Sequence, residues 1–80
     1  MRVPRDLSGA DLVKCLQRMG YGVTRQTGSH LRLTGAVHGV HHVTIPNHDP
    51  LRVGTLAAIL AAVAAHHGIT RDDLLHQLFD

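Results

Sequence analysis

Residues 27–33 read TGSHLRL and predict a turn followed by a strand. Gly28 and Ser29 favour a tight turn. The next five residues alternate polar and apolar side chains, which predicts a strand over 30–34 with one buried face. The side chains expected to face outward are those of His30, Arg32 and Thr34, and Leu31 and Leu33 are expected to face the core. A histidine therefore stands at the first position of a strand, on the exposed rim of a sheet.

The segments on either side of this strand predict its two neighbours. Residues 21–26 alternate and are rich in β-forming residues. Residues 42–45 place a second apolar pair on the core side, and Pro46 ends that strand. Pairing the core faces of the two later strands puts His42 on the same outer face as His30.

Helical patterns precede and follow the three strands. A capping box over Ser8–Asp11 opens a helix over 8–19. A second helix is marked from Leu56 and is stopped by Gly68, and a short third helix covers about 70–79. The order α-β-β-β-α-α predicts an α+β fold, a three-stranded antiparallel sheet with its helices on one face. This is the order of a double-stranded-RNA-binding domain with a short extra C-terminal helix.

Length and composition bound the class of protein. Eighty residues make a single domain over 1–80, with a core over about 7–68. Cys15 is the only cysteine, which excludes an intramolecular disulfide and a cysteine-rich zinc site and favours a reducing compartment. No apolar run is long enough to span a bilayer, and no apolar segment of a signal peptide follows the basic N-terminus. The sequence therefore predicts a cytoplasmic protein.

The chain is weakly basic and rich in histidine. Its formal charge is +2 with all 8 histidines neutral, which fits an anionic partner such as nucleic acid. Tyr21 and Phe79 are the only aromatic residues besides histidine, which argues against a protein that stacks successive bases on rings. The candidate RNA-binding residues are Gly28, Ser29, Lys14, Arg18, Arg25, Arg32 and Arg52.

The clustered histidines raise the alternative of a metal site. Those nearest one another in sequence are His38, His41, His42 and His48. Their spacing matches no known ligand pattern, and Asp49 is the one nearby carboxylate, so we expect no functional metal site and no cofactor. His66 and His67, at the end of the second helix, are expected to complement the negative end of its dipole.

Three segments, TGSH (27–30), VTIPNH (43–48) and GTL (54–56), lie between two helical patterns and resemble the HicA family of small RNA-cleaving toxins. The resemblance spans about Leu7 to Phe79, and its most specific part is the Gly-Ser-His turn. In HicA-like proteins the histidine of this turn is required for RNA cleavage, and it maps onto His30. The resemblance implies an mRNA interferase that acts on messenger RNA, and a HicB-type antitoxin partner that covers the His30 face.

The residues around His30 fit RNA cleavage without a metal. The 2′-hydroxyl of RNA is its own nucleophile, so a base, a cation for the phosphorane and an acid suffice, and a 2′,3′-cyclic phosphate results. His30 is the candidate catalytic acid or base, and Arg32 is a candidate phosphate ligand on the same face. His42 is the candidate second acid or base, although a solvent-facing sheet residue is the commoner role.

An alternative function stays open at this point. Relatives often carry a histidine or an aromatic residue at the position of Leu31 and basic residues along the second helix, where this chain has alanines. The alternative is a non-catalytic RNA-binding module of the same fold. The alanine-rich second helix also suggests burial against the third helix or against another copy of the chain, in a homo-oligomer.

Overall fold

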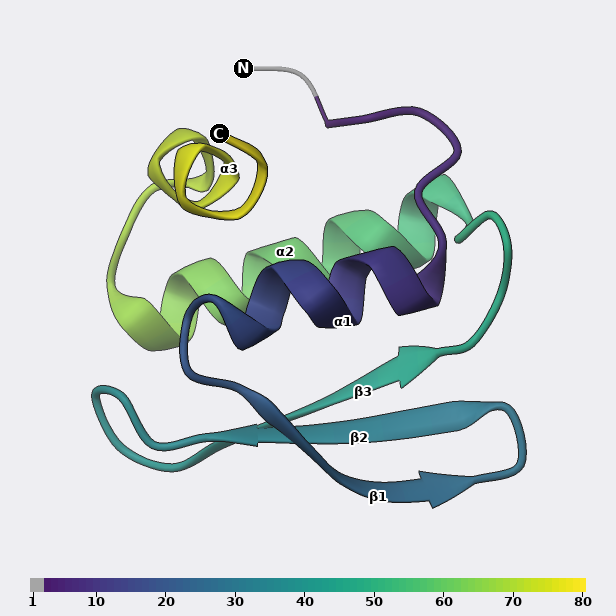
Figure 1. Ribbon diagram of the computed structural model, residues 1–80. Coiled ribbons are helices and arrows are strands. Elements are labelled where there is room, and N and C mark those ends of the chain that lie inside the picture. The colour runs from purple at the N-terminus through teal and green to yellow at the C-terminus, as the bar shows by residue number, and fades with distance from the viewer. Residues whose placement is uncertain (1–2) are drawn as a thin grey trace.

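A computed structural model describes residues 3–80 and confirms the α-β-β-β-α-α order. The helices are α1 (Gly9–Gln17), α2 (Val53–His67) and α3 (Arg71–Phe79), and the strands are β1 (Gly22–Thr27), β2 (His30–Gly35) and β3 (His41–Pro46). The strands form one antiparallel sheet in the order β1-β2-β3. Figure 1 shows three layers, with α1 and α2 side by side over one face of the sheet and α3 crossing them on the far side. No described element covers the other face of the sheet.

The strand register brings the expected core faces together. Leu31 pairs with Ile45, and Leu33 pairs with Val43. Leu33 and Ile45 are fully buried, whereas Leu31 is half-buried near the end of the sheet. The helices complete the core with a further set of fully buried side chains, namely Leu12, Leu16, Leu60, Val63, Leu74, Leu75 and Leu78. The alternation read from the sequence therefore fixes which face of the sheet meets the helices.

The first helix is shorter than predicted at its C-terminal end. Ser8 is the N-cap, and the reciprocal hydrogen bonds of its capping box with Asp11 are present. The helix ends at Gln17 because Gly20, with φ of +91°, turns the chain so that the N–H of Tyr21 donates to the carbonyl of Leu16. Tyr21 itself is buried, and the first strand therefore covers 22–27 rather than 21–26.

The second helix begins three residues before Leu56, at Val53. Residues 53–55 carry no buried apolar side chain to mark the start of the helix in the sequence, since Val53 is 85% exposed. Gly68 ends this helix in the left-handed conformation, as predicted. Thr70 caps α3 by accepting a hydrogen bond from the backbone N–H of Asp73.

Among residues 3–80, no single helix is long and apolar enough to cross a membrane. The pair α2 and α3 together reach that length and composition but are bent by 103° at the break between them.

Candidate active site at the open end of the sheet

His30 stands where β2 begins, at the end of the sheet that holds the β1–β2 turn, which we call the open end (Figure 1). The turn is a two-residue connection in which Thr27 pairs with His30, and Gly28 has φ of +56°, the pattern of a type II′ hairpin. On the other side His30 pairs with Pro46, and the N–H of Asn47 donates to the carbonyl of Ser29 at 2.6 Å. The imidazole is exposed, and no described residue hydrogen-bonds it. It is therefore positioned by its backbone and is free to meet a ligand.

The N-terminal ends of α1 and α2 lie toward this same end of the molecule (Figure 1). The N–H of Gly9, the first residue of α1, donates to the carbonyl of His48 at 2.8 Å, just beyond the end of β3. The N-cap of α2, Arg52, makes no side-chain capping hydrogen bond. The first-turn N–H groups of α2 are therefore uncapped by a side chain, and a helix N-terminus carries partial positive charge. The N-terminus of α2 therefore favours an anion at this end of the molecule.

A β-bulge brings two consecutive residues of β1 to the outer face of the sheet. Val23 pairs with Leu33 and Arg25 pairs with Arg32, so Thr24 is the extra residue between them. The hydroxyl of Thr24 donates to the carbonyl of Arg32 at 3.3 Å and lies 2.9 Å from the hydroxyl oxygen of Thr34. Arg25 and Arg32 stand directly opposite each other, and two like charges in such a pair are unfavourable without an anion between them.

His42 shares the outer face with His30, but the register does not bring the two side chains together. His42 pairs with Thr34, four residues along β2 from His30. At the usual rise of a strand this separation is about 13 Å. Nδ1 of His42 lies 2.9 Å from the hydroxyl oxygen of Thr34. His42 is therefore too far from His30 to exchange a proton with the same phosphate, and the pairing with His30 expected for a second acid or base is not found.

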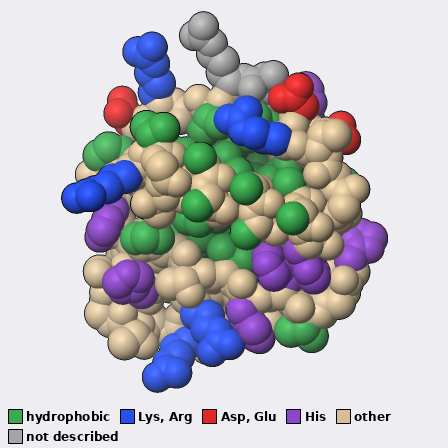
Figure 2. All heavy atoms as spheres, turned by 180° about the vertical axis from the view of Figure 1, so that it is seen from behind, with side chains coloured by type: hydrophobic (Ala, Val, Ile, Leu, Met, Phe, Trp, Pro, Cys, Tyr) green, Lys and Arg blue, Asp and Glu red, His purple; other side chains and the backbone are tan. Residues whose placement is uncertain are grey.

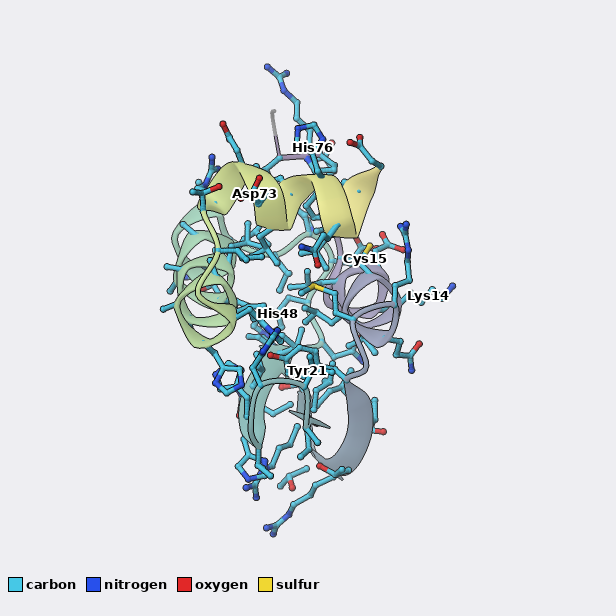
Figure 3. The ribbon with its side chains drawn as sticks, turned by 90° about the vertical axis from the view of Figure 1, so that its left-hand side faces the viewer. Lys14, Cys15, Tyr21, His48, Asp73 and His76 are labelled. Atoms are coloured by element: carbon cyan, nitrogen blue, oxygen red, sulfur yellow. The ribbon has the colours of Figure 1, made fainter. Side chains whose placement is uncertain are left out.

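The structure divides the predicted RNA-binding residues among three places. Arg25 and Arg32 lie on the outer face with His30, and the Gly28-Ser29 turn precedes it. Arg52 is exposed at the start of α2. Lys14 projects from α1, on the helix side of the sheet (Figure 3).

Arg18 has a structural partner. Its Nη1 donates to the carbonyl of Leu78 at 3.0 Å and its Nη2 to the carbonyl of Asp80 at 2.9 Å. These carbonyls belong to the C-terminal end of α3, where backbone acceptors lack helical partners and the dipole favours a cation. Arg18 therefore joins α1 to α3 and lies away from the outer face of the sheet.

A cluster of five rings that the sequence did not reveal lies at the opposite end of the sheet. Its members are Tyr21, His38, His41, His66 and His67. The hydroxyl of Tyr21 lies 2.7 Å from Nδ1 of His41 and 2.9 Å from Nε2 of His67. Figure 3 shows Tyr21 between the sheet and the helical layer. We call this group the tyrosine–histidine cluster.

The cluster ties the β2–β3 loop to the end of α2. His41 and His66 are stacked with ring centroids 4.2 Å apart and an interplanar angle of 7°. Nε2 of His66 donates to the carbonyls of Val37 and Gly39, at 3.2 and 3.1 Å. His66 and His67 thus do more than complement the helix dipole. Their part in this cluster depends on a loop 27 to 29 residues away and has no periodic signal in the sequence.

Burial and neighbouring imidazoles lower the pKa of two of these histidines. Desolvation is the larger cause for both His41 and His67, and repulsion from a protonated His66 adds to it. Burial also raises the pKa of Tyr21. The hydrogen bonds agree with these directions: one phenol proton can serve one imidazole, so the other must donate to the phenol oxygen, and neutral rings satisfy both.

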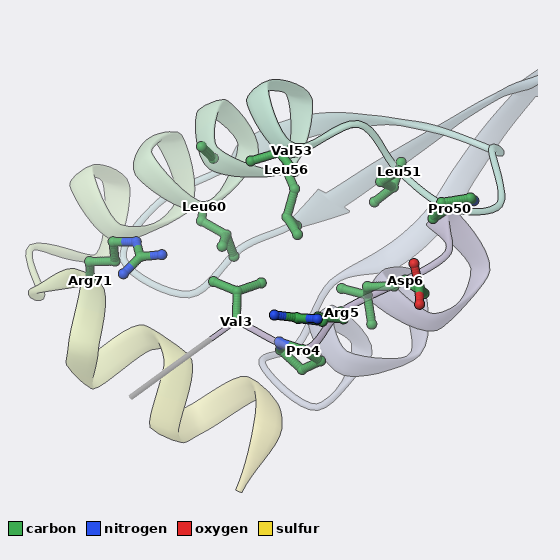
Figure 4. A pocket seen from close by; sticks show the side chains of 12 residues that line it. Val3, Pro4, Arg5, Asp6, Pro50, Leu51, Val53, Leu56, Leu60 and Arg71 are labelled. Carbon is green, nitrogen blue, oxygen red and sulfur yellow. The ribbon is translucent and has the colours of Figure 1, made fainter.

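Two other features of the described residues bear on a ligand site. No group of three or more histidine, cysteine or acidic side chains in this part of the chain is arranged to hold a metal ion. A cavity of about 610 Å³ lies on the helix side, walled mainly by apolar residues that include Val3, Leu51, Leu56 and Leu60, with Arg5 and Arg71 (Figure 4). None of the residues lining it belongs to the predicted site.

Residues 9–64 match the family model described as "HicA toxin of bacterial toxin-antitoxin". The match covers most of the chain, so the protein belongs to the HicA toxin family, and membership implies a partner in a toxin–antitoxin system. The matched residues include the Gly-Ser-His turn, all three strands and most of α2. No curated protein and no solved structure matches the chain significantly.

Proposed function

We propose that this protein is a metal-independent endoribonuclease that cleaves messenger RNA in the cytoplasm, as the toxin of a type II toxin–antitoxin pair. The observation that carries the proposal is the exposed imidazole of His30 at the open end of the sheet, beside a Gly-Ser turn and an arginine pair, in a chain of the HicA family. The proposal makes His30 the catalytic acid or base.

The cleavage step needs two proton transfers. A base takes the proton of the 2′-hydroxyl, the freed oxygen attacks phosphorus, the bond to the 5′-oxygen breaks, and an acid returns a proton to that oxygen. His30 performs one of these transfers, and water serves the other because the site is open. Arg32 and Arg25, with the backbone N–H groups of Gly28 and Ser29, neutralise the charge that builds on the phosphorane. The products are a 2′,3′-cyclic phosphate and a free 5′-hydroxyl.

The partner we propose is a HicB-like antitoxin that lies directly over His30. An acidic antitoxin surface would meet His30 and Arg32 and would be drawn to them by opposite charge. Because RNA and antitoxin then compete for one surface, Arg32→Glu weakens binding of both. An unchanged antitoxin affinity in that variant, or a complex that leaves His30 open, contradicts direct blocking.

The alanines on the outer side of α2 support a smaller part of the proposal. Although α3 packs on α2, several alanines stay exposed, namely Ala57, Ala58, Ala61, Ala62 and Ala65. Figure 2 shows hydrophobic side chains across the middle of the molecule in this view. We propose that this surface is covered by a second copy of the chain. Sedimentation velocity across a concentration series tests it, and a monomer at all concentrations contradicts it.

A cleavage assay on single-stranded RNA tests the main proposal. The wild type is compared with His30→Ala and with His76→Gln, which removes an exposed imidazole from α3. We expect His30→Ala to lower the cleavage rate by about 10²- to 10⁴-fold, because general acid–base catalysis typically contributes that factor. His76→Gln should keep the wild-type rate. EDTA should leave cleavage unchanged, and the product should end in a 2′,3′-cyclic phosphate.

Three results would overturn the proposal. One is cleavage by His30→Ala at the wild-type rate, and another is activity that needs added Mg²⁺. The third is RNA binding without cleavage by the wild type, which supports the non-catalytic RNA-binding module instead.

A further inference from the structure

A row of hydrogen-bonded polar side chains crosses the outer face of the sheet at a distance from His30. It contains one residue from each strand, Thr24, Thr34 and His42, with 2.9 Å between successive polar atoms. All three are on a face that no described helix covers. The cleavage step described above does not use this row.

The row is one of three successive outward-facing positions along β2, which we call steps. His30 is the first, the Arg32–Arg25 pair is the second, and the Thr24–Thr34–His42 row is the third. Side chains on one face of a strand recur every two residues, so neighbouring steps are about 7 Å apart. This spacing is close to the separation of successive phosphates in an extended nucleic-acid strand.

The three strands contain no acidic residue. The six acidic residues of the chain all lie elsewhere, at Asp6, Asp11, Asp49, Asp72, Asp73 and Asp80. Figure 2 agrees, since Lys or Arg side chains project at the sheet side, at the bottom of the view, while the visible acidic side chains are at the top. A polyanion lying along β2 therefore meets cationic and neutral donors alone.

We propose that the outer face binds an extended single strand of RNA by its phosphates, and that His42 holds the phosphate two steps beyond the one beside His30. The inference rests on the proposed function for the identity of the substrate as RNA. No described element covers this face, and its three steps follow one β-strand. The surface therefore suits one extended strand of nucleic acid. Because the contacts are to phosphates, they do not read the base sequence. The strands also carry no aromatic ring other than imidazole on which a base could stack.

The hydrogen bonds of the row suit a protonated His42. The hydroxyl of Thr24 donates to the carbonyl of Arg32, so its oxygen is free to accept from the hydroxyl of Thr34. The oxygen of Thr34 then accepts from Nδ1–H of His42. Nε2 has no hydrogen-bond partner among the described residues, and when protonated it can donate to a phosphate. The charged groups facing His42 are Arg32 and Arg25 on the neighbouring strands, and His41 is beside it in β3.

Equilibrium binding to uncleavable RNA tests the inference apart from catalysis. The probe is a single-stranded RNA of about twelve nucleotides, methylated at every 2′-oxygen so that the nucleophile is blocked. Binding by the wild type is compared with that of His42→Gln, Thr34→Val and the control His76→Gln, over a salt series at pH 6.

His42→Gln should weaken binding about fivefold at pH 6, the effect of one hydrogen bond. It should also lower the slope of log K against log salt by about 0.7 at pH 6, the value for one phosphate contact on a single strand. Thr34→Val should change binding in the same direction, and His76→Gln should change nothing. With cleavable RNA, His42→Gln should raise KM and change kcat by less than twofold.

Equal binding by wild type and His42→Gln at pH 6 would overturn the inference. So would a salt slope that His76→Gln lowers as much as His42→Gln does, or a His42-dependent preference for duplex RNA. The two proposals can fail separately. Absence of cleavage together with His42-dependent binding would refute only the proposed nuclease activity. Intact cleavage with no effect of His42→Gln on binding would refute only the proposed phosphate contact of His42.

Discussion

The two ends of one sheet use the same side chain in opposite ways. At the open end, His30 has no described hydrogen-bond partner and stands in solvent beside a two-residue turn. At the other end, His41 and His67 share the hydroxyl of the buried Tyr21, and His41 stacks on His66. In Figure 1 the first end is the β1–β2 turn and the second is where the β2–β3 loop meets the end of α2.

The difference shows how environment decides what a histidine can do. A histidine that shares a hydrogen bond with a buried phenol, and whose pKa burial lowers, stabilises a contact between distant segments, and that ring nitrogen is not open to a substrate. A histidine held only by its backbone adds little to stability, and its proton is free to move. The predictions below test this division between a stabilising end and a reactive end.

The largest effect on stability is expected from Gly35→Ala at the stabilising end. A Cβ at Gly35 would lie 2.9 Å from the ring of Tyr21, which is held between two histidines and cannot easily shift. We expect the free energy of unfolding to fall by about 1–3 kcal/mol, as overpacking does. Urea denaturation measures it. The control is Gly22→Ala, where a Cβ meets open space and a small gain is expected. Equal losses in both variants would contradict the tight packing.

Tyr21→Phe is expected to have the next largest effect. The ring keeps its packing, but His41 and His67 lose the hydroxyl that joins them. The free energy of unfolding should fall by about 1–2 kcal/mol, while the RNA cleavage rate of the folded protein should not change. A fall in cleavage with unchanged stability would show that the two ends are not separate in function.

The pH dependence of stability should come from the same cluster. Since burial lowers the pKa of His41 and His67, the folded protein binds fewer protons than the unfolded chain below about pH 6.5. Their contribution to stability is therefore present above that pH and is lost as pH falls through the lowered pKa values. Denaturation midpoints between pH 8 and pH 5 should show this fall in the wild type and a smaller one in His67→Gln. A stability that rises on acidification would refute the assignment.

Local patterns predicted the fold well because each element carries its own signal. The alternation around Leu31 and Leu33, the Ser8 capping box and Gly68 each describe a few consecutive residues, and the structure has the elements they predict. Element ends were less predictable. Residues 53–55 of α2 include no buried apolar side chain, and Tyr21 belongs to the core rather than to the strand it precedes.

The candidate site was predictable only as far as the face of the sheet. Alternation placed His30, Arg32 and His42 outward, and the register shows that His42 lies opposite Thr34 rather than beside His30. The alternation left the register of the two strands open, and the observed Leu33–Val43 pair sets that distance. The tyrosine–histidine cluster had no such signal, because its members meet only when the β2–β3 loop packs against the end of α2.

The smallest effect is expected from Arg18→Gln, which tests a residue that the sequence grouped with the RNA-binding arginines. The structure gives Arg18 the carbonyls of Leu78 and Asp80 as partners, so its loss should loosen the end of α3. Because these bonds are largely exposed, the free energy of unfolding should fall by about 0.5–1.5 kcal/mol. Binding to the methylated RNA should stay at the wild-type level, whereas Arg32→Gln should weaken it with little change in stability. Lys14→Gln, on α1 and without a hydrogen-bond partner among the described residues, is the control for charge alone. If Arg18→Gln weakens RNA binding as much as Arg32→Gln does, the RNA surface extends over the helix side, and the division of the molecule into a reactive end and a stabilising end is too simple.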